Sequence, residues 1–231
     1  MAQAIVLSDI HLPYEDKRAL STALEFTRKI KPDTIILGGD ILDCYPLSTF
    51  HRVPSAPSLH QELEAGKNFL KELRRQHRNA DITFIFGNHE SRFEKRILER
   101  LPELHGSVAL SELLELDELD IIPVTEPVDN TSVHWRGVDI AHYDIAGSNA
   151  PRKIIADIGV STVQCHTHHQ SLTKKRYKDR TITVVENGCL CGLDPQYVKN
   201  PNWQHGFSYL IAENGMTTII PIQIQDGKIN Y

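Results

Sequence analysis

The stretch AIVLSDIH, residues 4–11, decides the architecture of this chain, because an apolar run ends there in polar residues. Four consecutive apolar residues followed by Ser8 and Asp9 are typical of a buried strand that carries polar side chains at its C-terminal end. Residues 17–30 then have apolar positions at helical spacing. The next apolar run, residues 34–37, ends in Gly-Gly-Asp. This order of strand, helix and strand predicts an α/β fold.

The same order recurs further along the chain. Residues 62–77 are predicted to form an amphipathic helix, and residues 82–86 a strand that ends at Gly-Asn-His-Glu. Between the two units, residues 41–59 contain three prolines and little periodicity. We expect an irregular loop there, of the kind that often carries function beside strand ends. Two further helices are expected in this half, at residues 91–101 and 111–116.

After residue 131 the sequence consists of short β-rich segments separated by turns. One helix is expected, at residues 149–158. Strands are expected at residues 133–135, 138–141, 161–164, 171–177, 181–186, 207–212 and 217–224. The chain has no internal repeat and no low-complexity segment. We therefore predict a single α/β domain over residues 1–231, built as a sandwich of two mixed β-sheets with flanking helices.

The composition is that of an ordinary globular protein. Of 231 residues, 40% are hydrophobic and 24% are charged, which excludes a disordered chain. The formal charge of -5 argues against a broad basic surface that coats nucleic acid, although a local groove could still be positive. No apolar run approaches the roughly 18 residues of a membrane span, and the N-terminus has no export-type leader. We expect a cytoplasmic protein without a membrane partner, and the sequence favours no particular oligomeric state.

The four cysteines are Cys44, Cys165, Cys189 and Cys191, and their spacing does not suggest a secreted disulfide framework. Cys189 and Cys191 could be half of a zinc site, but no second cysteine pair completes one. We expect free thiols in a reducing cytosol.

Polar residues stand where the predicted strands end, and in open α/β sheets these ends form the ligand crevice. Five such positions follow an apolar run by no more than a few residues: Asp9, Asp40, Asn88, His142 and His166. Asp9 and His11 can both turn toward one ion from a single segment. His166 and His168 are likewise two residues apart, so both can turn toward one site from a single segment.

Aspartate, asparagine and histidine ligands without thiolates suit Mn²⁺, Fe, Zn²⁺ or Ni²⁺. One aspartate can bridge two such ions about 3.5–4 Å apart, and the pair can activate a bridging hydroxide. Fixed cations stabilise the transition state of phosphate-ester hydrolysis, in which the phosphate oxygens gain negative charge. Alone, a D-x-H motif is more typical of a turn than of a metal site, and Gly39-Asp40 and Gly87-Asn88 are equally typical of strand-terminating turns. The ordered set of five indicates a metal site.

The set resembles the motif series of the calcineurin-like metallophosphoesterases, which is D-x-H, G-D-x-x-D, G-N-H-[DE], a histidine after a strand, and G-H-x-H. The resemblance extends over residues 5–170. The corresponding stretches here are Asp9-Ile10-His11, Gly39-Asp40-Ile41-Leu42-Asp43, Gly87-Asn88-His89-Glu90, His142, and His166-Thr167-His168. The resemblance implies the four-layer fold of that family and a centre with two divalent ions. Mn²⁺ is our first expectation, with Fe, Zn²⁺ and Ni²⁺ as alternatives.

The resemblance also implies the role of each residue. One ion would be held by Asp9, His11, Asp40 and His168. The other would be held by Asn88, His142, His166 and the shared Asp40. His89 would be the catalytic residue, donating a proton or hydrogen bond to a phosphate oxygen, with Glu90 or Asp43 to orient it. His142 has the weakest motif, and its alternative is a strand-end histidine bonded to backbone.

The chain departs from the family pattern at Cys165 and Tyr143, which stand where glycine is usual or common. We expect Cys165 to narrow the approach to the second ion and Tyr143 to line the substrate pocket. Residues 186–191 and 201–207 also resemble a subgroup found often in bacteriophages and prophages.

The substrate implied is a phosphomonoester or phosphodiester, including a nucleotide or nucleic acid. Alternatives within this chemistry are a nuclease acting on DNA or RNA ends and a cyclic-nucleotide phosphodiesterase. An alternative of another class is a metal-binding scaffold without turnover, against which the non-ligand His89 argues. Arg52 and Arg92 could clamp phosphate or be solvated charges, and Trp203 could stack on a base or simply pack.

Overall fold

The computed structural model describes residues 1–49, 55–127, 130–195 and 201–230. Its strands are β1 (Ala2–Leu7), β2 (Thr34–Leu37), β3 (Asp81–Ile85), β4 (Ile121–Val124), β5 (Asn130–Trp135), β6 (Val138–Tyr143), β7 (Thr162–Gln164), β8 (Gln170–Arg176), β9 (Thr181–Asn187), β10 (Gly206–Glu213), β11 (Met216–Gln225) and β12 (Lys228–Asn230). Its α-helices are α1 (Lys17–Ile30), α2 (Leu59–Gln76), α3 (Ser91–Arg100), α4 (Leu110–Leu113) and α5 (Ala150–Asp157). Two 3-10 helices, η1 (Tyr45–Leu47) and η2 (Pro102–Leu104), complete the elements of the described part.

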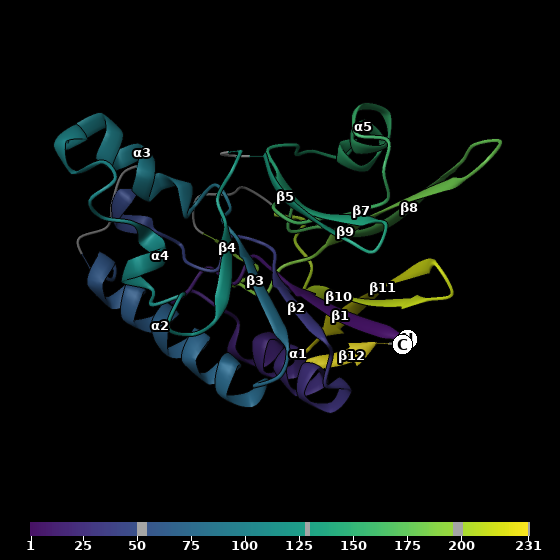
Figure 1. The fold of residues 1–231 in the computed structure, drawn as a ribbon, viewed down its shortest axis with the longest axis horizontal. Coiled ribbons are helices and arrows are strands. Elements are labelled where there is room, and N and C mark those ends of the chain that lie inside the picture. The colour runs from purple at the N-terminus through teal and green to yellow at the C-terminus, as the bar shows by residue number, and fades with distance from the viewer. Residues whose placement is uncertain (50–54, 128–129, 196–200, 231) are drawn as a thin grey trace.

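The strands form two mixed sheets, which pack as a sandwich with helices on both outer faces (Figure 1). The first sheet has seven strands in the order β12-β11-β10-β1-β2-β3-β4, and strands β1 to β4 run parallel. The second has five strands in the order β5-β6-β7-β9-β8. The predicted α/β sandwich of two mixed sheets with flanking helices is confirmed.

Local sequence signals explain where the two crossover helices begin and end. Asp16 caps α1, because its carboxylate accepts hydrogen bonds from the backbone of the first turn. The helix ends at Ile30, and the capping residue Lys31 has a φ of 52° and precedes Pro32. The helix predicted from residue 62 begins at Leu59, since Ser58 and Gln61 form a capping box.

Strand β4 is an element that the hydrophobic pattern does not predict. Pro123 interrupts its apolar run, and proline is tolerated in sheets at an edge. β4 lies at the edge of the seven-stranded sheet, beside β3. Its pairing partner therefore decides its conformation, which the local sequence does not.

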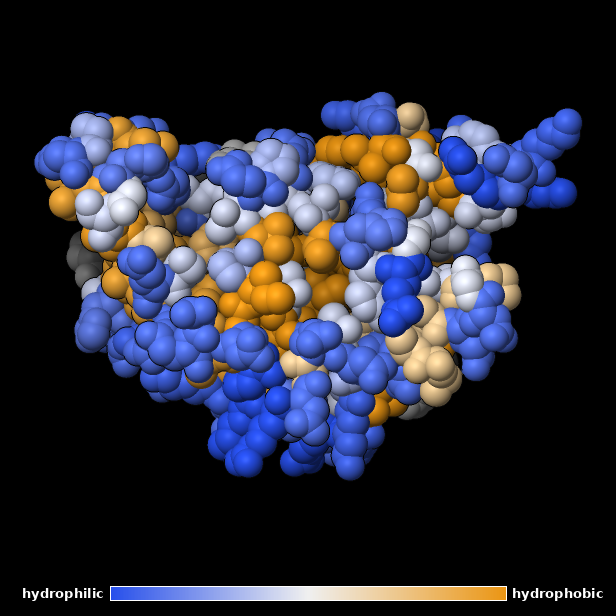
Figure 2. Space-filling view, viewed as in Figure 1, coloured by the Kyte–Doolittle hydropathy of each residue, from blue (hydrophilic) through white to orange (hydrophobic). Residues whose placement is uncertain are grey.

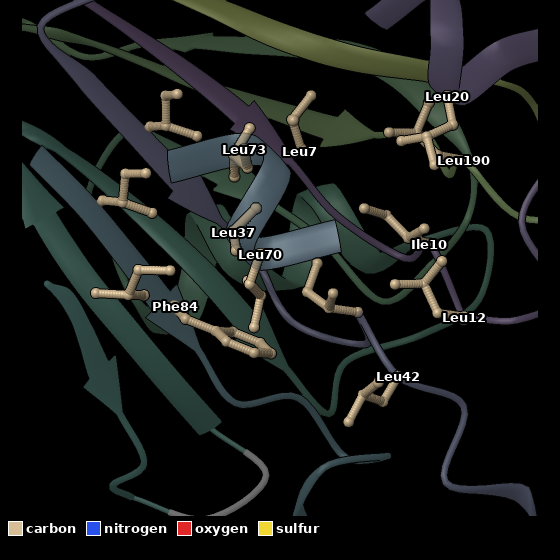
Figure 3. Close-up of a cluster of buried hydrophobic side chains, with 14 of the residues drawn as sticks. Leu7, Ile10, Leu12, Leu20, Leu37, Leu42, Leu70, Leu73, Phe84 and Leu190 are labelled. Atoms are coloured by element: carbon tan, nitrogen blue, oxygen red, sulfur yellow. The ribbon is translucent and has the colours of Figure 1, made fainter. Parts of the chain in front are cut away.

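Three hydrophobic clusters fill the spaces between the layers. The largest lies between the first sheet and helices α1 and α2, where Leu70 and Leu73 of α2 face Leu37 and Phe84 of the sheet (Figure 3). A second joins the two sheets, and a third lies between the second sheet and α5. Within the described ranges, no helix is both long and apolar enough to cross a bilayer.

Candidate metal centre

The seven predicted ligands and His89 all lie at the C-terminal ends of the central strands. β1, β2 and β3 end at Leu7, Leu37 and Ile85, and each delivers one motif within a few residues. The second sheet contributes His142 from the end of β6, and the H-x-H motif follows β7. Because these strand ends meet at one edge of the sandwich, motifs distant in sequence become neighbours.

Five of the seven predicted ligands have a left-handed backbone conformation. Their φ angles are 52° at Asp9, 53° at His11, 51° at Asp40, 81° at His166 and 56° at His168. Non-glycine residues occupy this region at a cost of about 1–3 kcal/mol each, although aspartate and histidine do so more readily than most. In each D-x-H and H-x-H segment both polar residues are left-handed, so the segment curls. Such strain is characteristic of functional sites.

The first group of donor atoms comes from Asp9, His11, Asp40 and His168. One donor atom from each lies within 4.8 Å of the others. Nε2 of His168 is 3.2 Å from Oδ1 of Asp9 and 3.2 Å from Nε2 of His11. Ligands of one ion at about 2.1 Å can lie roughly 4 Å apart. Small side-chain movements would therefore suffice for this group to hold a divalent ion.

The second group comes from Asp40, His142 and His166, whose donor atoms also lie within 4.8 Å of one another. Oδ1 of Asn88 joins them, at 3.1 Å from Nε2 of His142 and 2.9 Å from Nδ1 of His166. Asp40 thus belongs to both groups, and its Oδ2 atom faces imidazoles from each: Nε2 of His11 at 3.8 Å and of His142 at 3.4 Å.

The electrostatics of both groups favour a cation. Burial opposes protonation of His142, but the charge and hydrogen bond of Asp40, together with Asp9 and the backbone of Gly38, outweigh it and raise the pKa of the ring to about 10. Burial likewise opposes protonation of His168, and its hydrogen bond with Asp9 raises the pKa to about 10. The buried carboxylates therefore attract positive charge strongly enough to hold protons on these imidazoles. A divalent ion would meet the same need.

His89 differs from these histidines, because burial lowers its pKa to about 4. Its Nδ1 atom is 2.7 Å from the backbone oxygen of Asp43 and donates to it, which leaves Nε2 as an acceptor in the neutral ring. Arg92 donates to that Nε2 over 2.9 Å, and also to the Asp43 carbonyl over 3.0 Å. His89 lies in the turn just before α3, and the backbone nitrogen of Arg92 in the first turn of that helix donates to the His89 oxygen over 3.1 Å, which brings the two side chains together. Arg52, the other candidate for a phosphate clamp, lies outside the described residues.

Glu90 does not orient His89 in this arrangement. Both of its carboxylate oxygens accept backbone hydrogen bonds, from Asp40 and Gly87 at one oxygen and from Leu42 at the other, each over 2.9 Å. Glu90 therefore ties together the loops that follow β2 and β3. Of the two predicted orienting partners, Asp43 contacts the ring, most closely through its backbone oxygen. Its carboxylate is 3.7 Å from Nδ1 of His89 and closer, at 3.1 Å, to Nδ1 of His11.

The expectations for Cys165 and Tyr143 are wrong. Cys165 is buried between the two sheets, beside Gly38, and so does not narrow the approach to the second group. Tyr143 packs with Ile154 in the cluster under α5. Both side chains are apolar enough to fill core positions next to a polar centre, which motif comparison alone does not reveal.

Two neighbours of the centre come from the C-terminal third. The ring of Trp203 meets that of His168 edge-on, with centroids 4.1 Å apart. The sulfur of Cys191 lies 3.8 Å from Nδ1 of the same histidine. The spacing of Cys189 and Cys191 suggests at most half of a zinc site and does not indicate contact with His168, which Cys191 reaches through tertiary packing. All four cysteines are free.

Two converging sets of nitrogen and oxygen donors with one carboxylate in common, at the strand ends of an α/β sandwich, are the hallmark of metallophosphoesterases. The chain belongs to the calcineurin-like phosphoesterase family, whose sequence profile matches residues 3–216. It is therefore a member of a family of phosphate-ester hydrolases with candidate metal ligands gathered at its strand ends.

Similar proteins agree with this family and with the phage-type subgroup. The Gene 54 protein of Mycobacterium phage D29 is 23% identical over 247 residues, covering 98% of this chain and 95% of that protein. The Gene 54 protein of Mycobacterium phage L5 is 23% identical over 230 residues, covering 90% and 88%. The structure of Vacuolar Protein Sorting 29 from Cryptosporidium parvum shares the fold, with a TM-score of 0.52 at 14% identity, over 99% of this chain and 94% of that one. The predicted resemblance to the family and to phage proteins is confirmed.

Proposed function

We propose that this protein hydrolyses phosphate esters at a centre of two divalent metal ions. The observation that carries the proposal is the position of Asp40, whose carboxylate belongs to both groups of donor atoms. A shared carboxylate is what a two-ion centre requires and what two independent single-ion sites do not.

The first ion would be bound by Asp9, His11, Asp40 and His168, and the second by Asn88, His142, His166 and Asp40. Nitrogen and carboxylate donors suit Mn²⁺, our first choice, as well as Fe, Zn²⁺ and Ni²⁺. When bound, such ions activate water as a nucleophile and neutralise charge that develops on the phosphate. The reducing cytoplasm is the proposed place of action, supported by the free cysteines.

His89 and Arg92 would act on the phosphate directly. The guanidinium of Arg92 is half-buried beside the centre and matches the geometry of two phosphate oxygens. A phosphate that recruits Arg92 would release Nε2 of His89, and its negative charge would favour protonation of that atom. His89 would then donate to an equatorial or departing oxygen, while Asp43 holds Nδ1.

An activity panel in Mn²⁺ tests the proposal with phosphomonoesters, phosphodiesters, cyclic nucleotides and single-stranded DNA. We expect hydrolysis of at least one class, and its loss when a chelator removes the metal. Inactivity on all classes, with metal demonstrably bound, would favour the alternative of a scaffold without turnover.

A second, narrower candidate is a nuclease, and the hairpin of β8 and β9 favours it. Residues 174–180, KKRYKDR, contain five basic residues and one acidic residue in a chain whose formal charge is -5. All five basic side chains are exposed, and none forms an ion pair with another described residue. The hairpin projects from the body (Figure 1), and its end is strongly hydrophilic (Figure 2). Such a local basic surface suits a phosphate backbone.

The hairpin is also connected to the centre. β8 begins at Gln170, two residues after His168, and ends at Arg176. At about 3.3 Å per residue it carries the basic residues roughly 20 Å from the centre. A polynucleotide with one phosphate at the centre could reach the hairpin, whereas a mononucleotide could not. This separation makes the nuclease candidate distinguishable from a small-ester phosphatase.

A further inference from the structure

The segment Cys189-Leu190-Cys191 lies directly against the loop that carries Asp9. Leu190 donates a backbone hydrogen bond to the oxygen of Asp9 over 3.0 Å, and its own oxygen accepts one from Asp16 over 2.8 Å. Cys191 forms a β-bridge with Glu15. The segment is therefore fixed relative to the candidate metal centre, and the side chain of Cys191 is buried there, with 4% of its surface exposed.

The sulfur of Cys191 faces one nitrogen of His168, and the metal centre faces the other. Sγ is 3.8 Å from Nδ1. Nε2, across the ring, lies 3.2 Å from both Asp9 Oδ1 and His11 Nε2. A neutral histidine ligand offers a lone pair from one nitrogen and carries its proton on the other. With Nε2 among the donor atoms, Nδ1 carries the proton and directs it at the sulfur.

Other histidines of the centre have an acceptor in the corresponding place. Nδ1 of His11 is 3.1 Å from the carboxylate of Asp43, and Nδ1 of His142 is 2.8 Å from the backbone oxygen of Gly38. Such outer partners fix the tautomer and the ring orientation of metal-binding histidines. At His168, the group that faces Nδ1 is the sulfur of Cys191.

We propose that Cys191 is a positioning residue of the metal centre, whose sulfur accepts the Nδ1 hydrogen bond of His168 and keeps Nε2 turned toward the ion. This inference rests on the proposed function, because it requires an ion between Asp9, His11, Asp40 and His168. The rival role is direct ligation, since Cys191, His11 and His168 also have donor atoms within 4.8 Å of one another. An ion shared by Sγ and Nδ1, however, would lie across the ring from Asp9.

Metal affinity of matched cysteine variants tests the inference. Binding of Mn²⁺ to Cys191→Ala, Cys191→Ser and Cys189→Ala would be measured by chelator competition, with circular dichroism as a check of folding. Cys189 is the control, because it is buried in the same segment while its sulfur faces the backbone of Gln204 at 3.6 Å and the side chain of Cys191 rather than a histidine of the centre. We expect Cys191→Ala to lower the affinity for one of the two ions about 10–100-fold. The affinity of Cys191→Ser should lie between those of Cys191→Ala and the wild type, because a hydroxyl can accept the same hydrogen bond. Cys189→Ala should bind both ions normally.

Wild-type affinity for both ions in Cys191→Ala would overturn the inference, as would an equal loss in Cys189→Ala. A second measurement does not depend on the folding of any variant. Co²⁺ bound to the wild-type protein should lack the near-ultraviolet charge-transfer band of a thiolate ligand, and its presence would identify Cys191 as a direct ligand and refute the positioning role. Failure of the wild-type protein to bind any ion would instead refute the proposed function.

Discussion

Oδ2 of Asp40 lies 3.4 Å from Nε2 of His142, which joins the first sheet to the second across the candidate metal centre. The other oxygen of Asp40 accepts a hydrogen bond from the backbone of His89 over 2.9 Å. One oxygen therefore faces the donor groups while the other holds the loop after β3. This division makes Asp40 the residue whose replacement should affect both ions.

Asp40→Asn should weaken metal binding at both positions, because the shared carboxylate loses its negative charge while its shape is kept. Metal content per chain, measured by elemental analysis after gel filtration, should fall below the wild-type value for both ions. Asp117→Asn, at an exposed position, is the control and should bind normally. Two ions at full occupancy in Asp40→Asn would contradict the shared role.

His89→Gln should keep both metals and lose roughly 10²–10⁴-fold in kcat, the usual range for general acid–base catalysis. Glutamine can donate a hydrogen bond but cannot transfer a proton, and its amide would not reproduce both contacts of the imidazole. The comparison is His60→Gln, an exposed histidine on α2, which should keep full activity. Unchanged turnover with bound metal in His89→Gln would remove His89 from the mechanism.

Gly87→Ala should disturb the centre without a change in charge. A Cβ atom at Gly87 would collide with Oδ1 of Asp40 and lie 2.9 Å from Cε1 of His142. We expect metal affinity to fall by about tenfold or more, as for other changes that displace ligands. Gly192→Ala provides the matched control, because the nearest atom to its Cβ would be the Tyr14 oxygen at 3.8 Å. Equal metal binding by the two variants would mean that Asp40 can move without loss.

Glu62→Gln should stabilise the protein increasingly as the pH rises. Glu62 is fully buried, and its Oε2 has no hydrogen-bond partner among the described residues. Burial, with help from the charge of Asp43, raises its pKa from 4.5 to about 8. Between these values the unfolded chain is ionised at Glu62 and the folded protein is not, so the free energy of unfolding declines as the pH rises toward 8 and then levels off.

The variant lacks this decline because glutamine stays neutral. Urea denaturation at pH 5 to 9 should show a stability difference, variant minus wild type, that grows up to about pH 8. The exposed Glu99→Gln substitution on α3 should leave the corresponding difference flat. A flat profile for Glu62→Gln as well would mean that Glu62 is solvated in the folded protein.

The basic hairpin can be tested by neutralising Lys174, Lys175 and Arg176 together. If the substrate is a polynucleotide, its KM should rise and depend less on salt, since fewer counterions are released on binding. The KM for a small chromogenic phosphodiester should not change. The control is a triple neutralisation of exposed basic residues elsewhere: Arg28, Arg78 and Lys228. An unchanged polynucleotide KM would leave the lysines with the simpler role of protecting the edge strand β8 from pairing.

Many of the strands of this protein, and the polar residues at their ends, can be predicted from its sequence. The apolar runs that end in Asp9, Asp40 and Asn88 predict the strands and their polar ends, because burial and turn formation are properties of neighbouring residues. The order of the motifs likewise indicates the family. The hydrophobic pattern does not predict β4, since its conformation depends on pairing with β3.

The order of residues along the chain places each type of donor at the end of a particular strand. How the donors meet depends on tertiary packing: Asp40 faces donors of both groups, Arg92 donates to His89, and Glu90 accepts hydrogen bonds from the backbone. The same holds for Cys191, which reaches His168 because its segment is bonded to the loop of Asp9. The physical reason is that spacing along the chain fixes contacts within a few residues, whereas the packing of two sheets and their loops fixes contacts between distant segments.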